Sequence, residues 1–309
     1  MRDQMVSMVK QAQEEICNAI ASIDNSDYRE DEWTREGGGG GRSRVFSSGS
    51  VFEKAGVNVS EVHGVLSEET AVRMGGGIGP DGNLEFFATG ISLVLHPKNP
   101  MAPSVHSNYR YFERGEGENG NSWWFGGGAD LTPSYLFEED AIHFHAAYKK
   151  ICDRHAVADY GRFKNWCDEY FYNSHRKEGR GVGGIFFDDL REGGKDDCFA
   201  FVEDCASGFL ESYIPILDRR KDMPFDQAQE VWQRIRRGRY VEFNLIHDRG
   251  TKFGLRTDGR VESILMSLPL EARWEYCHQV TEGSDEARMV AVLRAVSYTH
   301  LTLPTKRIV

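Results

Sequence analysis

The sequence predicts an α+β fold built on a large antiparallel β-sheet. Segments typical of strands lie together between residues 44 and 125, while segments typical of helices dominate residues 136–246. The two types do not alternate strictly, as they would in a doubly wound parallel sheet. No internal repeat and no linker divides the chain, so we expect a single domain over residues 1–294.

The first half of the chain contains one helical pattern and several strand patterns. Between residues 5 and 23, apolar side chains recur every three or four positions, which predicts an amphipathic helix. Residues 84–95 mix β-branched and aromatic side chains, and residues 109–112 and 123–125 share this character, so we expect strands there. The five glycines at 37–41 favour a flexible loop, although a close approach of the backbone to an anionic ligand remains open.

The second half is mainly helical in pattern. We expect helices at about residues 136–155, 160–175, 196–218 and 225–246, with one strand at 183–188. Residues 252–268 predict a β-hairpin whose turn is the Thr-Asp-Gly-Arg sequence at 257–260.

Composition excludes several classes of protein. The formal net charge of −11 argues against a nucleic-acid binder that relies on a global positive field. No apolar run approaches the length of a membrane span, and the N-terminus lacks the apolar region of a signal peptide. The six cysteines include no CxxC pair and are typical of reduced thiols. We therefore expect a cytoplasmic protein with no nucleic-acid partner.

Residues 96–110 contain three prolines, which exclude a helix, together with two histidines and a final arginine. A metal site, an acid–base site and an ordinary surface loop all remain open for this segment. No HExxH motif or EF-hand loop is present, so histidines could bind a metal only if folding brings them together. The candidates are His96, His106, His145 and His175.

Other common catalytic motifs are missing from the sequence, including GxSxG, GxGxxG and the P-loop. What remains is a set of side chains suited to anions and protons. Arg110 and Arg260 suit carboxylates, because the planar guanidinium can bind them with two hydrogen bonds. Asp130 precedes Leu-Thr-Pro and could equally be a helix N-cap or part of an Asx-turn.

The segment WWFGGGADLTP at residues 123–133 closely resembles the oxygen-dependent coproporphyrinogen III oxidase family. The resemblance runs from the N-terminal helix to about Arg294. It includes residues 96–112, GRGVGGIFFD at 179–188, YVEFNLIHDRGTKFG at 240–254 and ESILMSLP at 262–269. Several long motifs in the same order make this resemblance highly specific.

The resemblance implies a fold, a reaction and a partner. The fold is a large antiparallel sheet flanked by α-helices on both faces, and residues 240–275 are expected to form a homodimer contact. The reaction is the oxidative decarboxylation of two propionates of coproporphyrinogen III to vinyls, which gives protoporphyrinogen IX in haem biosynthesis. O2 is the co-substrate and CO2 is released. No organic cofactor is expected, and a divalent metal is an open alternative.

The resemblance also implies which residues act. The positions that match substrate-binding residues are Ser92, Asn108, Tyr109, Arg110, Gly259 and Arg260. His106 matches a proton donor, and the family's proposed metal ligands match His96, His106, His145 and His175. We hypothesise that Arg110 pairs with a propionate, and that Asp130 accepts or fixes the proton of a pyrrole N–H.

Two other functions remain open, and the sequence differs from the family pattern at two places. A non-catalytic tetrapyrrole-binding protein would not need Asp130 and His106 together, while a metal-dependent oxygenase of another substrate would need the histidines. Asp258 stands beside the substrate-binding Gly259, where the family often has a small residue, and a carboxylate there would repel propionates unless it points away. The tail at 295–309 matches nothing expected of the family, which an artefact of cloning or sequence assembly would explain.

Overall fold

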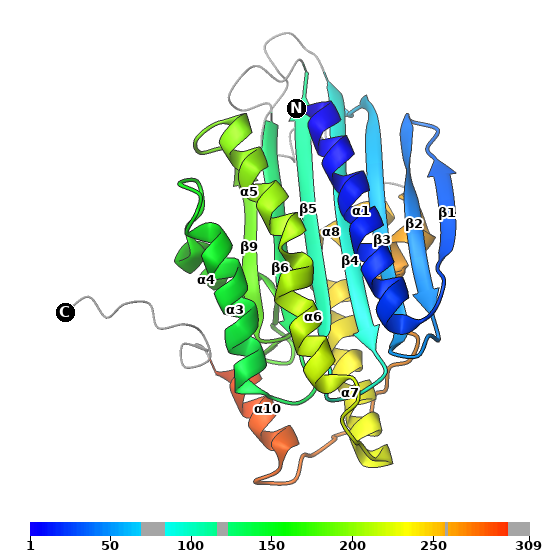
Figure 1. The fold of residues 1–309 in the computed structure, drawn as a ribbon, viewed down its shortest axis with the longest axis vertical. Helices are drawn as coiled ribbons and strands as arrows, with labels where there is room; N and C mark the ends of the chain where they lie inside the picture. Colours follow the sequence, from blue (N-terminus) through cyan, green and yellow to red (C-terminus); the bar gives the residue numbers. More distant parts are fainter. Residues whose placement is uncertain (69–83, 116–122, 257–258, 296–309) are drawn as a thin grey trace, which may run out of the picture.

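The computed structural model of the protein describes residues 1–68, 84–115, 123–256 and 259–295. These residues form a seven-stranded antiparallel sheet with helices on both faces, which confirms the predicted α+β class (Figure 1). The strands follow chain order across the sheet, except that the last position belongs to a later strand. From edge to edge they are β1 (Arg29–Thr34), β2 (Gly39–Ser47), β3 (Phe52–Val65), β4 (Glu85–Pro97), β5 (Ser104–Arg114), β6 (Trp123–Thr132) and β9 (Gly183–Leu190).

The central strands have one buried side and one partly open side. In β5 the odd-numbered side chains from Val105 to Tyr111 are buried, and the even-numbered ones from Ser104 to Arg110 are partly exposed. Successive side chains of a strand point to opposite faces of the sheet. We call the buried face the core face and the partly open one the site face.

Four helices cover the core face and lie in front of the sheet in Figure 1. They are α1 (Arg2–Asp24), α3 (Glu138–Cys152), α5 (Lys195–Ser207) and α6 (Phe209–Arg220). The apolar stripe of α1 packs on β3 and β4, as its spacing predicts. Phe144 and Tyr148 of α3 join the same hydrophobic core as Tyr109 of β5. Beside β9 lies α4 (Tyr160–Tyr170), which ends earlier than the predicted residue 175.

Segments from the second half of the chain lie over the site face, behind the sheet in Figure 1. They are α7 (Gln227–Glu242), the π-helical turn η1 (Phe243–His247), α8 (Arg249–Arg256) and α9 (Val261–Leu265). A two-stranded ribbon of β7 (Tyr172–Asn173) and β8 (Glu178–Gly179) precedes β9, and α10 (Asp285–Arg294) follows α9. None of the described helices is long and apolar enough to cross a lipid bilayer.

The hairpin predicted for residues 252–268 is wrong. These residues belong to α8 and α9, and between the two helices the Gly259 N–H donates to the Gly254 carbonyl oxygen at 2.8 Å. The missed signal is a helix start, because the Asp248 carboxylate accepts from the Thr251 N–H at 2.6 Å in the manner of an N-cap. The centre of the predicted turn, at 257–258, lies outside the described residues.

The glycine run at 37–41 is also not a loop throughout, because its last three residues begin β2 and pair with β1 and β3. A Cβ atom at Gly41 would lie 2.4 Å from Cζ2 of Trp33. The absence of a side chain therefore lets the indole ring lie directly over the strand. The backbone of this segment is thus closely approached by a side chain of the neighbouring strand β1.

Candidate active site

A histidine, an aspartate and an arginine meet on the site face near the centre of the sheet. His106 on β5 and Asp130 on β6 are cross-strand partners, so their side chains share a face. His106 Nδ1 lies 2.8 Å from Asp130 Oδ1. Arg180, between β8 and β9, donates from Nη2 to both carboxylate oxygens at 2.7 and 2.8 Å. Asp130 therefore lies within a strand, and the N-cap and Asx-turn alternatives are wrong.

Asp130 is ionised although it is buried. The side chains of Asp130 and Arg180 are only 1% and 2% exposed. Burial alone would raise the pKa of Asp130, but the charge of Arg180 and the hydrogen bond from His106 outweigh burial and hold that pKa below its usual range. A carboxylate is tolerated at such a position only when it is paired and hydrogen-bonded.

The ionised carboxylate determines the proton position on His106. A carboxylate only accepts hydrogen bonds, so His106 Nδ1 must be the donor. In the neutral ring, Nε2 then carries the lone pair, and no described residue forms a hydrogen bond with it. The His106 side chain is 20% exposed, so the site face leaves room for a ligand to reach it. A carboxylate that orients a histidine in this way is typical of acid–base catalysis.

Aromatic rings enclose the guanidinium group of Arg180. Its central carbon lies 4.1 Å from the ring centre of Phe171, 4.8 Å from that of Tyr240 and 4.9 Å from that of Phe243. Nη1 donates to Oδ1 of Asn244 in η1 at 2.8 Å. π-helical turns are frequent at functional sites. Sequence reasoning missed Arg180 as a site residue, although its Gly-Arg-Gly setting just before a strand was a signal.

A row of small polar side chains, which we call the polar row, crosses the site face beside this group. From β2 to β5 its members are Ser43, Asn58, Ser92 and Asn108, each opposite the next. Neighbouring strands are about 4.8 Å apart, so the row spans about 14 Å. Glycines on the same face flank it at Gly90 and Gly128, and at Gly56, where the side chain of Met266 packs over the strand. The result is a low, flat floor with hydrogen-bonding groups.

Arg110 lies at one border of this floor. It donates from Nη1 to Asn108 Oδ1 at 2.8 Å and from Nη2 to Asp188 Oδ1 at 2.9 Å, and it lies 5.5 Å from the ring centre of Trp124. A Cβ at Gly126 would come within 2.7 Å of Asp188 Oδ1 and 2.9 Å of Arg110 Nε, so this pair needs a glycine there. Sequence reasoning missed Asp188, because an aspartate at the end of a strand is a common surface residue.

Tyr109 departs from the predicted set of substrate contacts. Its side chain is 1% exposed and belongs to the core face, together with Tyr148. Strand alternation causes this, because Asn108 and Arg110 on either side of it point to the site face. A ligand on the site face can therefore meet only the main chain of Tyr109.

Arg260 lies at the opposite end of the polar row from Asn108. It directly precedes α9, and its Nη2 lies 2.5 Å from Asp31 Oδ2 on the edge strand β1. Ser263 Oγ lies 2.8 Å from Ser43 Oγ, which joins α9 to the row. These residues border a groove of about 740 Å³ between β1–β3 and α9, which we call the edge groove. This volume is in the range of small-molecule sites. Gly259 occupies the turn between α8 and α9.

The four histidines predicted as metal ligands have separate surroundings, and His96 is the first example. It is buried at the end of β4, where Nε2 donates to the Ser267 carbonyl oxygen at 2.9 Å and Nδ1 lies 3.0 Å from the Ser104 hydroxyl. Burial lowers the pKa of His96 to about 3. The ring is therefore neutral, and both of its nitrogens are engaged.

His145 and His175 are equally engaged. His145 lies on α3 over the core face, with Nε2 3.0 Å from a main-chain carbonyl and Nδ1 2.9 Å from the Tyr160 hydroxyl. Burial lowers its pKa to about 4. His175, between β7 and β8, has Glu242 at 2.8 Å from Nε2 and His247 at 2.8 Å from Nδ1.

The residues present do not fit the predicted metal site. A metal needs several side chains that converge with free lone pairs. Within the described ranges, no three His, Cys, Asp or Glu side chains converge in that way. Of the four histidines, only His106 keeps a nitrogen without a hydrogen bond to described residues. Residues that looked compatible in sequence lie on different elements and on different faces of the sheet.

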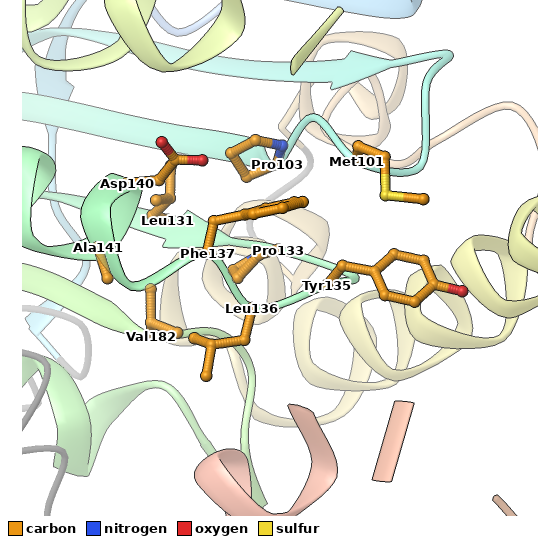
Figure 2. A pocket seen from close by; sticks show the side chains of 10 residues that line it. All are labelled: Met101, Pro103, Leu131, Pro133, Tyr135, Leu136, Phe137, Asp140, Ala141 and Val182. Atoms are coloured by element: carbon orange, nitrogen blue, oxygen red, sulfur yellow. The ribbon is translucent and has the colours of Figure 1, made fainter. Parts of the chain in front are cut away.

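A second cavity, shown in Figure 2, is too small to be the site. Its volume is about 10 Å³, which corresponds to about one water molecule. Apolar side chains line most of it, including Pro103, Leu131 and Phe137. It is a small packing defect beside the start of α3.

The fold and the site together define a class of protein. A histidine oriented by a buried carboxylate stands beside a flat polar floor and a partly exposed arginine. This arrangement suits proton transfer on a flat ligand that carries carboxylates.

Comparison with known proteins shows a family to which the chain is similar. The family described as coproporphyrinogen III oxidase matches residues 4–298. The chain is 52% identical over 297 residues to the chloroplastic oxygen-dependent coproporphyrinogen-III oxidase of Glycine max, a match that covers 94% of this chain and 77% of the relative. For the mitochondrial enzyme of Homo sapiens the identity is 53% over 300 residues, covering 95% and 66%. For the Drosophila melanogaster enzyme it is 48% over 300 residues, covering 95% and 77%.

The chain therefore belongs to the coproporphyrinogen III oxidase family. This confirms the family that the sequence motifs indicated.

Proposed function

We propose that this chain catalyses the aerobic oxidative decarboxylation of coproporphyrinogen III on its site face. Two propionates become vinyls, which gives protoporphyrinogen IX, and O2 accepts the electrons. The observation that carries this proposal is the group of His106, Asp130 and Arg180 beside the polar row, in a chain about half identical to oxygen-dependent coproporphyrinogen-III oxidases.

The balance of atoms and electrons shows which protons and electrons must be transferred in each decarboxylation. One propionate, one O2 and one proton yield one vinyl, one CO2 and one H2O2. The propionate loses two electrons as its carboxylate leaves and its β-carbon gives up a hydrogen, and O2 gains those two electrons. A reduced tetrapyrrole is electron-rich and can itself pass electrons to O2, so the proposal needs no organic cofactor.

His106 manages the protons in this proposal. Its Nε2 takes the proton of a pyrrole N–H, which raises the electron density of the ring, and O2 then adds to the ring. The resulting ring-bound peroxide takes the β-carbon hydrogen as a proton and leaves as hydroperoxide, which a further proton converts to H2O2. Loss of CO2 then supplies the electron pair of the vinyl group, and His106 returns its proton to the pyrrole nitrogen. An imidazole ring can both accept and return a proton at its free nitrogen, which suits this role.

Asp130 acts through His106 in this scheme. The earlier hypothesis, in which Asp130 itself accepts the pyrrole proton, fits the structure poorly. The carboxylate is buried, both of its oxygens bind Arg180, and its lowered pKa makes it a weak base. Asp130 instead holds His106 with Nδ1 as donor and stabilises the ring when Nε2 becomes protonated.

The flat floor binds the macrocycle. Arg110 and His106 are four residues apart on one face of β5, or about 13 Å along the strand. Arg110 can therefore hold a propionate at the rim while His106 reaches a pyrrole nitrogen nearer the centre. Ser92 and Asn108 of the polar row lie beneath the ring between them.

The direct test is to incubate purified protein with coproporphyrinogen III in air and under anaerobic conditions. After chemical oxidation of the products, protoporphyrin fluorescence is expected from the aerobic sample only. Product that forms equally well without O2, or no product in either sample, would reject the proposal.

Two alternative functions have clear tests. A non-catalytic tetrapyrrole carrier would bind the substrate and return it unchanged from the aerobic incubation. A metal-dependent oxygenase would lose activity after exhaustive chelation. We expect unchanged turnover in a sample whose metal content has been measured and found negligible, because the four histidines do not converge.

We also propose that the chain forms a homodimer through residues 240–275. Large apolar side chains are exposed in this part of the chain, and single soluble chains rarely expose large contiguous apolar patches. They are Leu245, Ile246, Phe253, Leu255, Val261, Leu270 and Trp274. Light scattering is expected to give twice the chain mass for the wild type.

A charged residue in this region tests the interface. Ile246→Glu is expected to give monomers, whereas Val65→Glu, at an exposed apolar position outside the region, should leave the mass unchanged. A wild type that is monomeric at micromolar concentration would reject the dimer proposal.

A cytoplasmic location remains a proposal. The relatives in Glycine max and Homo sapiens carry chloroplastic and mitochondrial in their names, so location differs between members of the family. Fractionation of cells of the source organism is expected to recover the protein in the cytosolic fraction. Recovery in an organelle fraction would reject this location.

A further inference from the structure

The edge groove contains three cationic side chains, two of which form no ion pair with a described residue. Arg29 on β1, Lys54 on β3 and Arg260 before α9 all line it. Arg260 is paired with Asp31 at 2.5 Å. Neither Arg29 nor Lys54 forms an ion pair with any residue in the described ranges, although the carboxylates of Asp27 and Glu262 also line the groove. Cations without partners in a groove of this size suit an anionic ligand.

Lys54 is the better defined of the two cations. Its ammonium group donates to the Leu268 carbonyl oxygen at 2.8 Å, which fixes its position and leaves two further N–H groups for a ligand. Burial lowers the pKa of Lys54, because the attraction of Glu53 and Glu262 does not offset the loss of hydration. A carboxylate that binds here would restore the missing charge partner.

Lys54 and Arg110 stand on opposite sides of His106 on the same face of the sheet. Lys54 on β3 lies opposite His96 on β4. His106 is on the next strand, β5, and is displaced along the sheet by two residues from this pair. Lys54 is thus two strand spacings from β5, or about 10 Å across the sheet, and about 7 Å along it from His106. Arg110 lies about 13 Å from His106 in the other direction along β5.

We propose that the edge groove is a second carboxylate subsite, in which Lys54, assisted by Arg29, binds a propionate that is not reacting. This inference rests on the proposed function, because it needs a flat substrate with several propionates on its rim. A macrocycle held by Arg110 at one side and by Lys54 at the other presents the ring between them to His106. Lys54 is then a residue that sets the orientation of the substrate and takes no part in proton transfer.

Binding of oxidised coproporphyrin III tests the subsite without turnover. This ligand keeps all four propionates, and its oxidised ring lacks the electron-rich pyrroles that react with O2. Titration of the full chain is followed by fluorescence. Lys54→Met keeps the length of the side chain but removes its charge, and we expect about tenfold weaker binding from the loss of one charge-assisted contact. Lys54→Arg should bind within about threefold of the wild type, because the charge is restored.

The matched control is Lys150→Met, since Lys150 is exposed on α3 over the core face and should not affect binding. Arg29→Met changes an exposed residue, so it will fold even if Lys54→Met proves unstable in a thermal melt. It should weaken binding about threefold as a weaker, more solvated contact. In turnover assays, Lys54→Met should raise KM and leave kcat within about twofold.

The outcomes separate this subsite from the proposed function. Wild-type binding that is lost in Arg110→Met but unchanged in Lys54→Met and Arg29→Met would overturn the subsite alone. A raised KM in Lys54→Met that Lys54→Arg restores would support it. No binding by the wild type, together with no turnover, would overturn the proposed function and the subsite with it.

Discussion

The two faces of one sheet carry different kinds of side chain. On the core face, Tyr109, Tyr111 and Phe125 are buried and pack against helices. On the site face, the sheet presents glycines, the polar row and the buried Asp130, which is paired with Arg180. Successive residues of one strand therefore have different roles, because one side chain packs in the core and the next faces the site. The comparison teaches that the core face supplies stability, so that the site face can hold an ion pair and an open floor.

The two faces also contribute differently to the free energy of unfolding. Burial of large aromatic side chains stabilises the fold in proportion to the apolar area removed from water. A buried ion pair contributes little net stability, because the loss of hydration offsets its attraction, yet losing one partner is costly. Variants on the two faces should therefore differ in how stability and activity respond.

The largest effect is expected from Arg180→Met. It leaves the Asp130 carboxylate buried without its partner, which should lower the free energy of unfolding by about 3–5 kcal/mol and abolish turnover. Urea denaturation and the aerobic assay measure the two effects. The double variant Arg180→Met/Asp130→Asn should recover most of the stability but not the turnover. If it is no more stable than the single variant, the paired-charge explanation fails.

Phe144→Ala probes the core face. Truncation of this fully buried ring should lower the free energy of unfolding by about 3–5 kcal/mol. Turnover per folded molecule, measured below the unfolding transition, should stay close to the wild-type value because Phe144 belongs to the core face, on the other side of the sheet from the His106 and Asp130 side chains. A fall in kcat for the folded enzyme would show that the two faces are not separable.

Gly126→Ala should have a smaller and more specific effect. The added Cβ must displace Arg110 or Asp188, so we expect KM for coproporphyrinogen III to rise about tenfold with little change in unfolding. Gly161→Ala, in helix α4, is a suitable control and should leave KM within about twofold. Equal KM values for the two variants would contradict the role given to Arg110.

Much of the fold could be predicted because its signals are local. The spacing in α1 and the β-branched and aromatic residues of β4 and β5 report local structure directly, and these elements are confirmed. The hairpin predicted for residues 252–268 failed because the helix cap at Asp248 was not recognised. The glycines of β2 were taken for a loop because their reason, the ring of Trp33, belongs to another strand.

The site was less predictable because its contacts are distant in sequence. Asp130 and Arg180 are 50 residues apart, and only folding shows that they form one buried pair. The same reason explains the metal ligands, since their positions in sequence say nothing about the face on which each histidine lies. Tyr109 shows the converse case, in which strand alternation alone could have assigned its side chain to the core face.

The most direct test of the account is the rate of protoporphyrinogen formation by His106→Asn. The asparagine amide can still donate to Asp130 from the position of Nδ1, but the variant has no Nε2. We predict that thermal unfolding stays close to that of the wild type and that coproporphyrin III still binds, while turnover falls by about 10²–10⁴-fold. A turnover rate near that of the wild type would contradict the central claim that Nε2 of His106 transfers protons on the site face.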